Sequence, residues 1–199
     1  MEYFPDDLSL EAVYPEWEKA VEAAVICYQN GGKILTCGNG GSASDSEHIV
    51  GELMKGFLKK RPVDNELAQK LGPKLAGSLQ MGLPAVSLVS QSAIMTAVMN
   101  DLGADAVYAQ QVMSLGKTGD ILIGISTSGN AENVCQAFQT AKAKDMVCIA
   151  LTGQSDSRMS GLADITLRAP AQSTPKVQEY HIRLYHAFCA AVEARFFPV

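Results

Sequence analysis

The chain has 199 residues, of which 47% are hydrophobic and 19% are charged, and its formal net charge is −5. This length suits one domain with a full hydrophobic core, and the composition excludes a disordered chain. The acidic balance argues against broad binding to nucleic acid, because no basic excess is present to neutralise phosphates. We therefore expect no nucleic-acid partner.

Three further features predict a soluble protein of the cytoplasm. No apolar run approaches the ~20 residues that cross a bilayer, so no membrane partner is expected. The acidic segment 1–7 lacks the basic-then-apolar order of a signal peptide. The 5 cysteines are scattered through mostly apolar stretches without a CxxC pair, which is typical of buried free thiols in a reducing compartment.

The first predicted element is a helix over residues 8–30, where apolar residues recur at spacings of three and four until Gly31. Pro15 lies inside this stretch, so the regular helix is expected to begin only there. Short apolar runs with strand character follow at 33–37, 85–90, 120–126, 146–152 and, more weakly, 164–169. Their apolar residues are mostly consecutive, as in strands that are covered on both faces.

Helical patterns at 43–58, 91–102, 105–115, 130–144 and 175–195 alternate with these strands. This alternation predicts an α/β fold of a single domain over 1–199, in which a five-stranded parallel sheet lies between two helical layers and the N-terminal helix occupies 1–32. The connection 59–83 is unusually long, and we expect a helical excursion, acting as a lid or an interface arm, with helices near 64–71 and 73–81. Ligands of such sheets bind beyond the carboxyl ends of the strands.

Two glycine- and serine-rich turns follow the first and third strands. The first is CGNGGS at 37–42, and the second is STSGN at 126–130. Each turn gathers backbone N–H groups, hydroxyls and a helix N-terminus, a combination that binds phosphate, although the same residue types also form plain turns and helix caps. Two such turns at equivalent strand ends favour an anionic ligand. Neither matches a nucleotide fingerprint, so we predict a small phosphorylated metabolite.

A pair of potential metal ligands lies on the helix after the first turn. His48 and Glu52 are four residues apart, so their side chains share one face of this helix. Such a pair can supply a nitrogen and an oxygen to one zinc ion, and it can equally be an ordinary pair on a helix surface. Its position close to the predicted phosphate site favours the metal.

Together these motifs resemble the sugar isomerase (SIS) domain and, more narrowly, the phosphoheptose isomerases. The resemblance covers nearly the whole chain. It is carried by the two turns, by Asp45, His48 and Glu52, by Asn100 and Asp101, and by Gln178, Glu179, His181 and His186. One departure is Ala131, where the family commonly continues STSGN with serine. The connection 59–83 is also longer than the family pattern.

The resemblance implies a SIS fold and one zinc ion per site, bound by His48, Glu52, Gln178 and His186. It casts Glu52 as the base and His186 as the acid in an aldose–ketose isomerisation of sedoheptulose 7-phosphate to D-glycero-D-manno-heptose 7-phosphate, through an enediol. The substrate-binding positions that it implies are Asn39, Gly40, Gly41, Ser42, Glu52, Asn100, Asp101, Ser126, Thr127, Ser128 and Gln178. It also implies a homo-oligomer, with a tetramer favoured, and a place in lipopolysaccharide biosynthesis.

Several alternatives stay open on the sequence. Eight residues of helix separate Gln178 from His186 by about 12 Å and roughly 80°. The two could share one ion if they lean together, if the helix begins irregularly near Gln178, or if they act from different subunits. His181 lies three residues after Gln178, so by helical spacing alone it is an alternative to His186 as a zinc ligand. We assign it a structural or supporting role. The Asn100-Asp101 pair also suits plain capping of a helix end. The competing functions are a non-catalytic SIS protein, such as those that bind the bacterial replication initiator, and an isomerase or sensor of another ketose phosphate.

Overall fold

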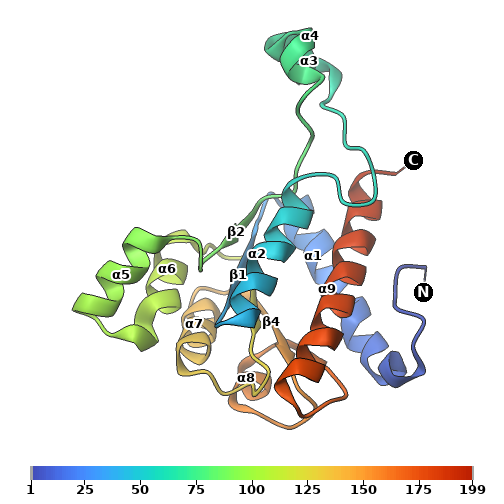
Figure 1. Ribbon diagram of the computed structural model, residues 1–199. Helices are drawn as coiled ribbons and strands as arrows, with labels where there is room; N and C mark the ends of the chain where they lie inside the picture. Colours follow the sequence, from blue (N-terminus) through green and yellow to red (C-terminus); the bar gives the residue numbers. More distant parts are fainter. Residues whose placement is uncertain (1, 199) are drawn as a thin grey trace.

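The computed structural model describes residues 2–198, which form a parallel β-sheet with helices on both faces (Figure 1). The strands are β1 (Ile34–Gly38), β2 (Ala85–Ser87), β3 (Ile121–Ile125), β4 (Val147–Thr152) and β5 (Ile165–Arg168). Their order is β2-β1-β3-β4-β5, and all neighbouring pairs are parallel. This arrangement confirms the predicted fold. The connections change direction between β1 and β3, at the kind of switch point where α/β sheets bind ligands.

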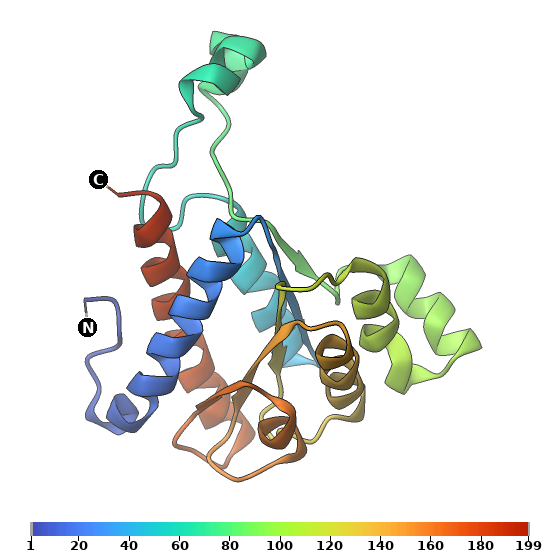
Figure 2. The ribbon, with the colours of Figure 1, turned by 180° about the vertical axis from the view of Figure 1, so that it is seen from behind.

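Two groups of helices cover the two faces of the sheet (Figure 2). α1, α2 and α9 share one apolar cluster with the strands, and α5, α6, α7 and α8 share the other. Neighbouring strand residues such as Ile34 and Leu35 belong to opposite clusters, which explains why the strand sequences read as continuous apolar runs. The bounds are α1 (Tyr14–Gln29), α2 (Gly41–Met54), α5 (Ser92–Asp101), α6 (Val107–Leu115), α7 (Glu132–Ala143), α8 (Arg158–Leu162) and α9 (Thr174–Phe196), with 3-10 turns η1 (Leu8–Val13) and η2 (Ala104–Ala106).

The ends of some elements differ from the predicted ones. Pro15 lies in the first turn of α1, after the 3-10 turn η1, as its fixed backbone angle predicted. α2 ends at Met54 and not near residue 58, because Lys55 is already extended. β2 ends at Ser87, earlier than predicted. α8 was not predicted, and it begins with a capping box between Ser157 and Ser160.

The segment 59–83, here called the arm, stands away from the sheet (Figure 1). It carries α3 (Asn65–Leu71) and α4 (Pro73–Ala76), whose residues are all exposed or half-buried. A single antiparallel bridge between Pro62 and Gln80 closes its neck. The second helix ends at Ala76, earlier than predicted, because the chain turns at Gly77.

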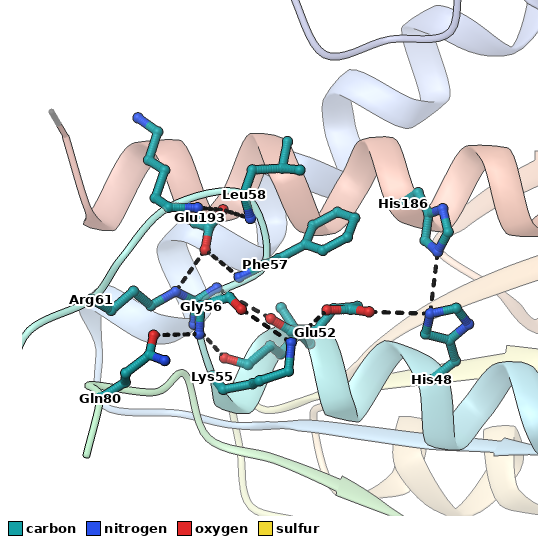
Figure 3. Close-up of polar contacts among 12 residues, drawn as sticks. His48, Glu52, Lys55, Gly56, Phe57, Leu58, Arg61, Gln80, His186 and Glu193 are labelled. Carbon is teal, nitrogen blue, oxygen red and sulfur yellow. Dashed lines mark hydrogen bonds and ion pairs between the residues drawn. The ribbon is translucent and has the colours of Figure 1, made fainter. Parts of the chain in front are cut away.

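A buried ion pair fastens the arm to the body (Figure 3). Arg61 and Glu193 are both fully buried, and the Arg61 Nε atom lies 2.8 Å from the Glu193 Oε1 atom. Glu193 also accepts the backbone N–H groups of residues 57–59. Arg61 in turn donates to the carbonyl oxygens of Leu53 and Glu52 at the end of α2. Burial opposes ionisation of Glu193, but these donors outweigh it and lower the pKa of the carboxyl group.

Candidate active site

The two predicted turns lie side by side at the carboxyl edge of the sheet. β1 and β3 are neighbours, and Gly38 at the end of β1 is in register with Ile125 at the end of β3. Asn39 in the first turn and Asn133 at the start of α7 exchange two side-chain hydrogen bonds, each of 2.9 Å. The structure thus connects the first turn to the helix that follows the second turn, through two residues 94 positions apart.

The backbone of the first turn requires its glycines. A Cβ atom on Gly38 would lie 2.5 Å from the Ser42 carbonyl oxygen, and Gly40 has a φ of +58°. A Cβ atom on Gly41 would overlap the amide of Gln178, so this α9 side chain lies against the start of α2. Gln178 is therefore close to the first turn.

The second turn presents hydroxyl groups at the same edge of the sheet. The Oγ atoms of Ser126 and Ser128 are 3.5 Å apart, and the Ser128 Oγ atom accepts the Asn130 backbone N–H. The Thr127 hydroxyl lies 3.4 Å from the Thr174 hydroxyl at the start of α9. The N-termini of α2 and α7 follow the two turns directly. Hydroxyls and helix N-termini in this arrangement favour an anion such as a phosphate ester.

A cluster of one carboxylate and two imidazoles, here called the His48 cluster, lies between α2 and α9 (Figure 3). The His48 Nε2 atom is 3.1 Å from the Glu52 Oε1 atom and 3.3 Å from the His186 Nε2 atom. Lys55 donates to the Glu52 Oε2 atom over 3.2 Å. The side chain of Glu52 is 14% exposed, so it faces these partners and not bulk water.

His186 combines partial burial with access from the surface. Burial lowers its pKa, and the charge of neighbouring His48 lowers it further, against a smaller opposite effect of Glu52. A surface hollow of about 430 Å³ reaches this imidazole, with Phe57 and Arg183 among its other lining residues. The lowered pKa keeps the imidazole neutral over more of the pH range, and a neutral imidazole has one N–H donor and one acceptor nitrogen.

The four predicted zinc ligands do not all meet within one chain. α9 is continuous from Thr174 to Phe196, so Gln178 lies about 12 Å before His186 along the helix axis. Within residues 2–198, no group of three or more His, Cys, Asp or Glu side chains is arranged to hold a metal ion. The atoms of the His48 cluster are nonetheless the nitrogen and oxygen donors that zinc prefers. The side chains of the His48 cluster are therefore of the right chemical type to bind zinc, and they include three of the four predicted ligands.

Three other predicted residues lie away from the His48 cluster. His181 is fully buried and its Nε2 atom contacts the Thr152 carbonyl oxygen at 3.1 Å, while burial lowers its pKa to about 4. This geometry fits the structural role expected for it. Asn100 and Asp101 end α5, on the opposite side of the molecule from α9, and the Asn100 amide donates to the Asp101 carboxylate over 2.7 Å (Figure 1). Within one chain they stand apart from the two turns.

The sequence did not single out several residues that shape the site. Tyr108 donates to the Gly38 carbonyl oxygen, Asn133 pairs with Asn39, and Tyr185 contacts His48. Asn133 falls in the first helical turn after STSGN, and this was an available signal. Tyr108 and Tyr185 contact residues 70 and 137 positions away, so no local pattern marks them.

The sheet order, the paired turns and the His48 cluster define an α/β protein with a candidate anion site at its switch point. Residues 10–153 match the family model of the SIS domain. A phosphoheptose isomerase from Burkholderia pseudomallei (strain 1710b) is 41% identical over 180 residues, which are 90% of this chain and 82% of that protein. The chain belongs to the SIS domain family, among the phosphoheptose isomerases, as the sequence motifs had indicated.

Solved structures agree with this membership. The phosphoheptose isomerase GmhA from Neisseria gonorrhoeae has a TM-score of 0.78 and 35% identity, covering 94% of this chain and 89% of that chain. A phosphoheptose isomerase from Francisella tularensis has a TM-score of 0.79 and 34% identity, covering 92% and 88% of the two chains.

Proposed function

We propose that the protein is a phosphoheptose isomerase that converts sedoheptulose 7-phosphate to D-glycero-D-manno-heptose 7-phosphate. The names of its relatives support this reaction. The observation that carries it is the His48 cluster, where a carboxylate and an imidazole meet on the helices that also border the anion-binding turns. A non-catalytic SIS protein would have no need to keep such acid and base groups together.

The proposed roles follow from the chemistry of an enediol reaction. The phosphate binds at the two turns, through the hydroxyls of Ser126 and Ser128 and the start of α2. Glu52 accepts the proton from C1 of the ketose, and His186 donates its proton to the carbonyl oxygen at C2, which gives the enediol. Glu52 then returns its proton to C2 while His186 takes the proton of the C1 hydroxyl, and the aldose forms. Base and acid must stand close together for this transfer, and both contact His48.

The length of a heptulose 7-phosphate suits the layout of the site. From Gly41, the rise of α2 places His48 about 10 Å and Glu52 about 16 Å along the helix. In the substrate, the phosphate and the reacting carbons lie at opposite ends of a seven-carbon chain. A separation between an anion site and an acid–base site supports a long sugar phosphate over a short one.

A zinc ion is part of the proposal. His48, Glu52 and His186 would hold it, and Gln178 would join from another subunit, since it lies two helical turns from His186 in its own chain. When bound, zinc supplies a Lewis acid that stabilises negative charge on the substrate oxygens. The donor set supports this assignment, because two imidazole nitrogens and one carboxylate oxygen are typical zinc ligands.

A homotetramer completes the proposed site. α5 carries the exposed apolar side chains Ile94 and Met99 as well as the implied substrate residues Asn100 and Asp101. Packing of α5 against another copy would cover these apolar groups and bring the two polar residues to that copy's turns. We place the enzyme in the cytoplasm, in lipopolysaccharide biosynthesis. Among residues 2–198, no helix combines the length and apolar character of a membrane span.

The test is conversion of sedoheptulose 7-phosphate by zinc-loaded protein, with the product identified by NMR. We expect the wild type to form the aldose and Glu52→Gln to lose at least about 100-fold in kcat. Glu47→Gln is the matched control on the same helix, because its carboxylate contacts Ser90 at the surface, and it should keep wild-type turnover. Full turnover by Glu52→Gln would remove this residue from the mechanism. No conversion by the wild type would favour the non-catalytic alternative.

A further inference from the structure

Tyr185 and Asp45 form a hydrogen-bonded pair behind the His48 imidazole. The Tyr185 hydroxyl donates to the Asp45 Oδ1 atom over 3.2 Å and lies 3.0 Å from the His48 Nδ1 atom. Tyr185 is 2% exposed and stands one residue before His186 on α9. Asp45 lies one helical turn before His48 on α2, so the two α2 side chains face α9 together.

The direction of these hydrogen bonds determines which nitrogen of His48 carries the proton. A phenol has a single hydrogen to donate. Because the Tyr185 hydroxyl donates it to Asp45, only a lone pair of its oxygen is left for His48 Nδ1. The Nδ1 atom must then be the N–H of the neutral imidazole, and the Nε2 atom keeps its lone pair. A phenol keeps its hydrogen at neutral pH, because its ordinary pKa is about 10.

The free lone pair of His48 points into the centre of the His48 cluster. Its Nε2 atom is the one that lies 3.1 Å from Glu52 and 3.3 Å from His186. In the metal-free protein this lone pair can accept a hydrogen bond from the His186 Nε2 atom when that atom carries the N–H. A metal ion that binds among the three side chains would take the place of that hydrogen.

We propose that the Asp45–Tyr185 pair is a positioning pair, which fixes His48 as the Nδ1–H tautomer and aims its Nε2 lone pair at Glu52 and His186. The tautomer does not depend on the proposed function. Its consequence for zinc binding rests on that function. Histidines that bind metals are generally held in this way, by an acceptor for the other ring N–H. Neither Asp45 nor Tyr185 contacts the reacting atoms in this scheme.

The aromatic packing allows a clean test. The Tyr185 ring lies edge-on to the His48 ring, with 5.4 Å between centroids, and edge-on to the His186 ring at 5.1 Å. Phenylalanine preserves these contacts and removes only the hydroxyl. The matched control is Tyr180→Phe on the same helix, because the Tyr180 hydroxyl contacts Ser9 and not the cluster.

The first measurement is the His48 tautomer in metal-free, ¹⁵N-labelled protein at about pH 8, where free imidazoles are neutral, read from two-bond ¹H–¹⁵N correlations. We expect Nδ1–H in the wild type and in Tyr180→Phe, and loss of this single tautomer in Tyr185→Phe. A wild-type His48 protonated at Nε2 overturns the proposal, and this reading needs no variant to fold. An unchanged tautomer in Tyr185→Phe overturns it as well.

The second measurement is zinc affinity by competition with a chelator. Tyr185→Phe should bind zinc about 10–100-fold more weakly than the wild type, and Tyr180→Phe should bind it equally. Equal affinity in Tyr185→Phe would show that the pair does not support the metal site. A wild type with the Nδ1–H tautomer and no zinc binding supports the positioning pair and counts against the metal in the proposed function.

Discussion

Asn39 in the first turn and Asn133 in α7, the helix after the second turn, form a reciprocal pair of amide hydrogen bonds, each 2.9 Å long. The Asn39 Oδ1 atom also lies 3.2 Å from the Tyr108 hydroxyl, which itself donates to the Gly38 carbonyl oxygen. The end of β1 is therefore fastened both to α6 and to α7. This clamp holds the first turn in place before any ligand binds.

Loss of this clamp should weaken phosphate binding more than turnover. Asn133→Ala removes both amide hydrogen bonds, and each such bond contributes about 0.5–1.5 kcal/mol. We expect KM to rise about 2- to 10-fold with kcat nearly unchanged, because the His48 cluster is untouched. Steady-state kinetics with sedoheptulose 7-phosphate measure this split. A fall in kcat with constant KM would contradict the role of the clamp.

The first turn should tolerate no side chain at Gly38. Alanine there would place its Cβ atom 2.5 Å from the backbone oxygen of Ser42, so the turn has to move. We expect Gly38→Ala to lower the free energy of unfolding by about 1–3 kcal/mol, as overpacking does. Gly51→Ala is the control, since its Cβ atom would point into open space on α2, and it should stabilise by up to about 1 kcal/mol. Urea denaturation distinguishes the two, and equal effects would contradict the steric argument.

Acid should destabilise the protein through His181. Its pKa in the folded protein is about 4, below the usual value of 6.5, because burial disfavours the imidazolium ion. The unfolded chain therefore binds a proton first as the pH falls, and stability is lost between about pH 6.5 and pH 4, by roughly 3 kcal/mol at most. His181→Gln cannot be protonated, so its unfolding free energy should fall less over this range. Parallel pH profiles for the two proteins would contradict this prediction.

The buried pair Arg61–Glu193 should matter far more than exposed ion pairs of the arm. Arg61→Met leaves Glu193 buried without its counter-charge, and such a loss costs about 3–5 kcal/mol. Lys70→Met breaks the exposed contact with Glu66 in α3 and should cause no measurable loss. Chemical denaturation gives both values. Similar stability of the two variants would mean that the arm is not held by Arg61.

The fold could be predicted because its signals are local. Strands covered on both faces read as continuous apolar runs, and the i, i+4 spacing placed His48 and Glu52 together. α8 is only 5 residues long, too short to show a helical period. The contacts of Asn39 with Asn133 and of Arg61 with Glu193 join residues 94 and 132 positions apart, and single-sequence patterns carry no such information.

The site residues were predicted unevenly for the same reason. The two turns and Glu52 have motifs of their own, whereas Tyr185 acts only through a side-chain contact across two helices. The spacing of Gln178 and His186 left open whether the helix begins irregularly near Gln178, and the structure shows α9 continuous from Thr174 to Phe196. The resemblance implied a substrate-binding role for Asn100 and Asp101, but it gave no information on whether that role would be met within one chain or between two.

The position of α9 in chain order has a consequence for biosynthesis. This helix follows every strand along the chain, yet it carries Gln178, Tyr185, His186 and Glu193 and covers one face of the sheet. While α9 is still inside the ribosome, the nascent chain exposes that apolar face. It then lacks both the His48 cluster and Glu193, which anchors the arm. Translation that stops early therefore yields a species prone to aggregation and proteolysis, without any partial activity.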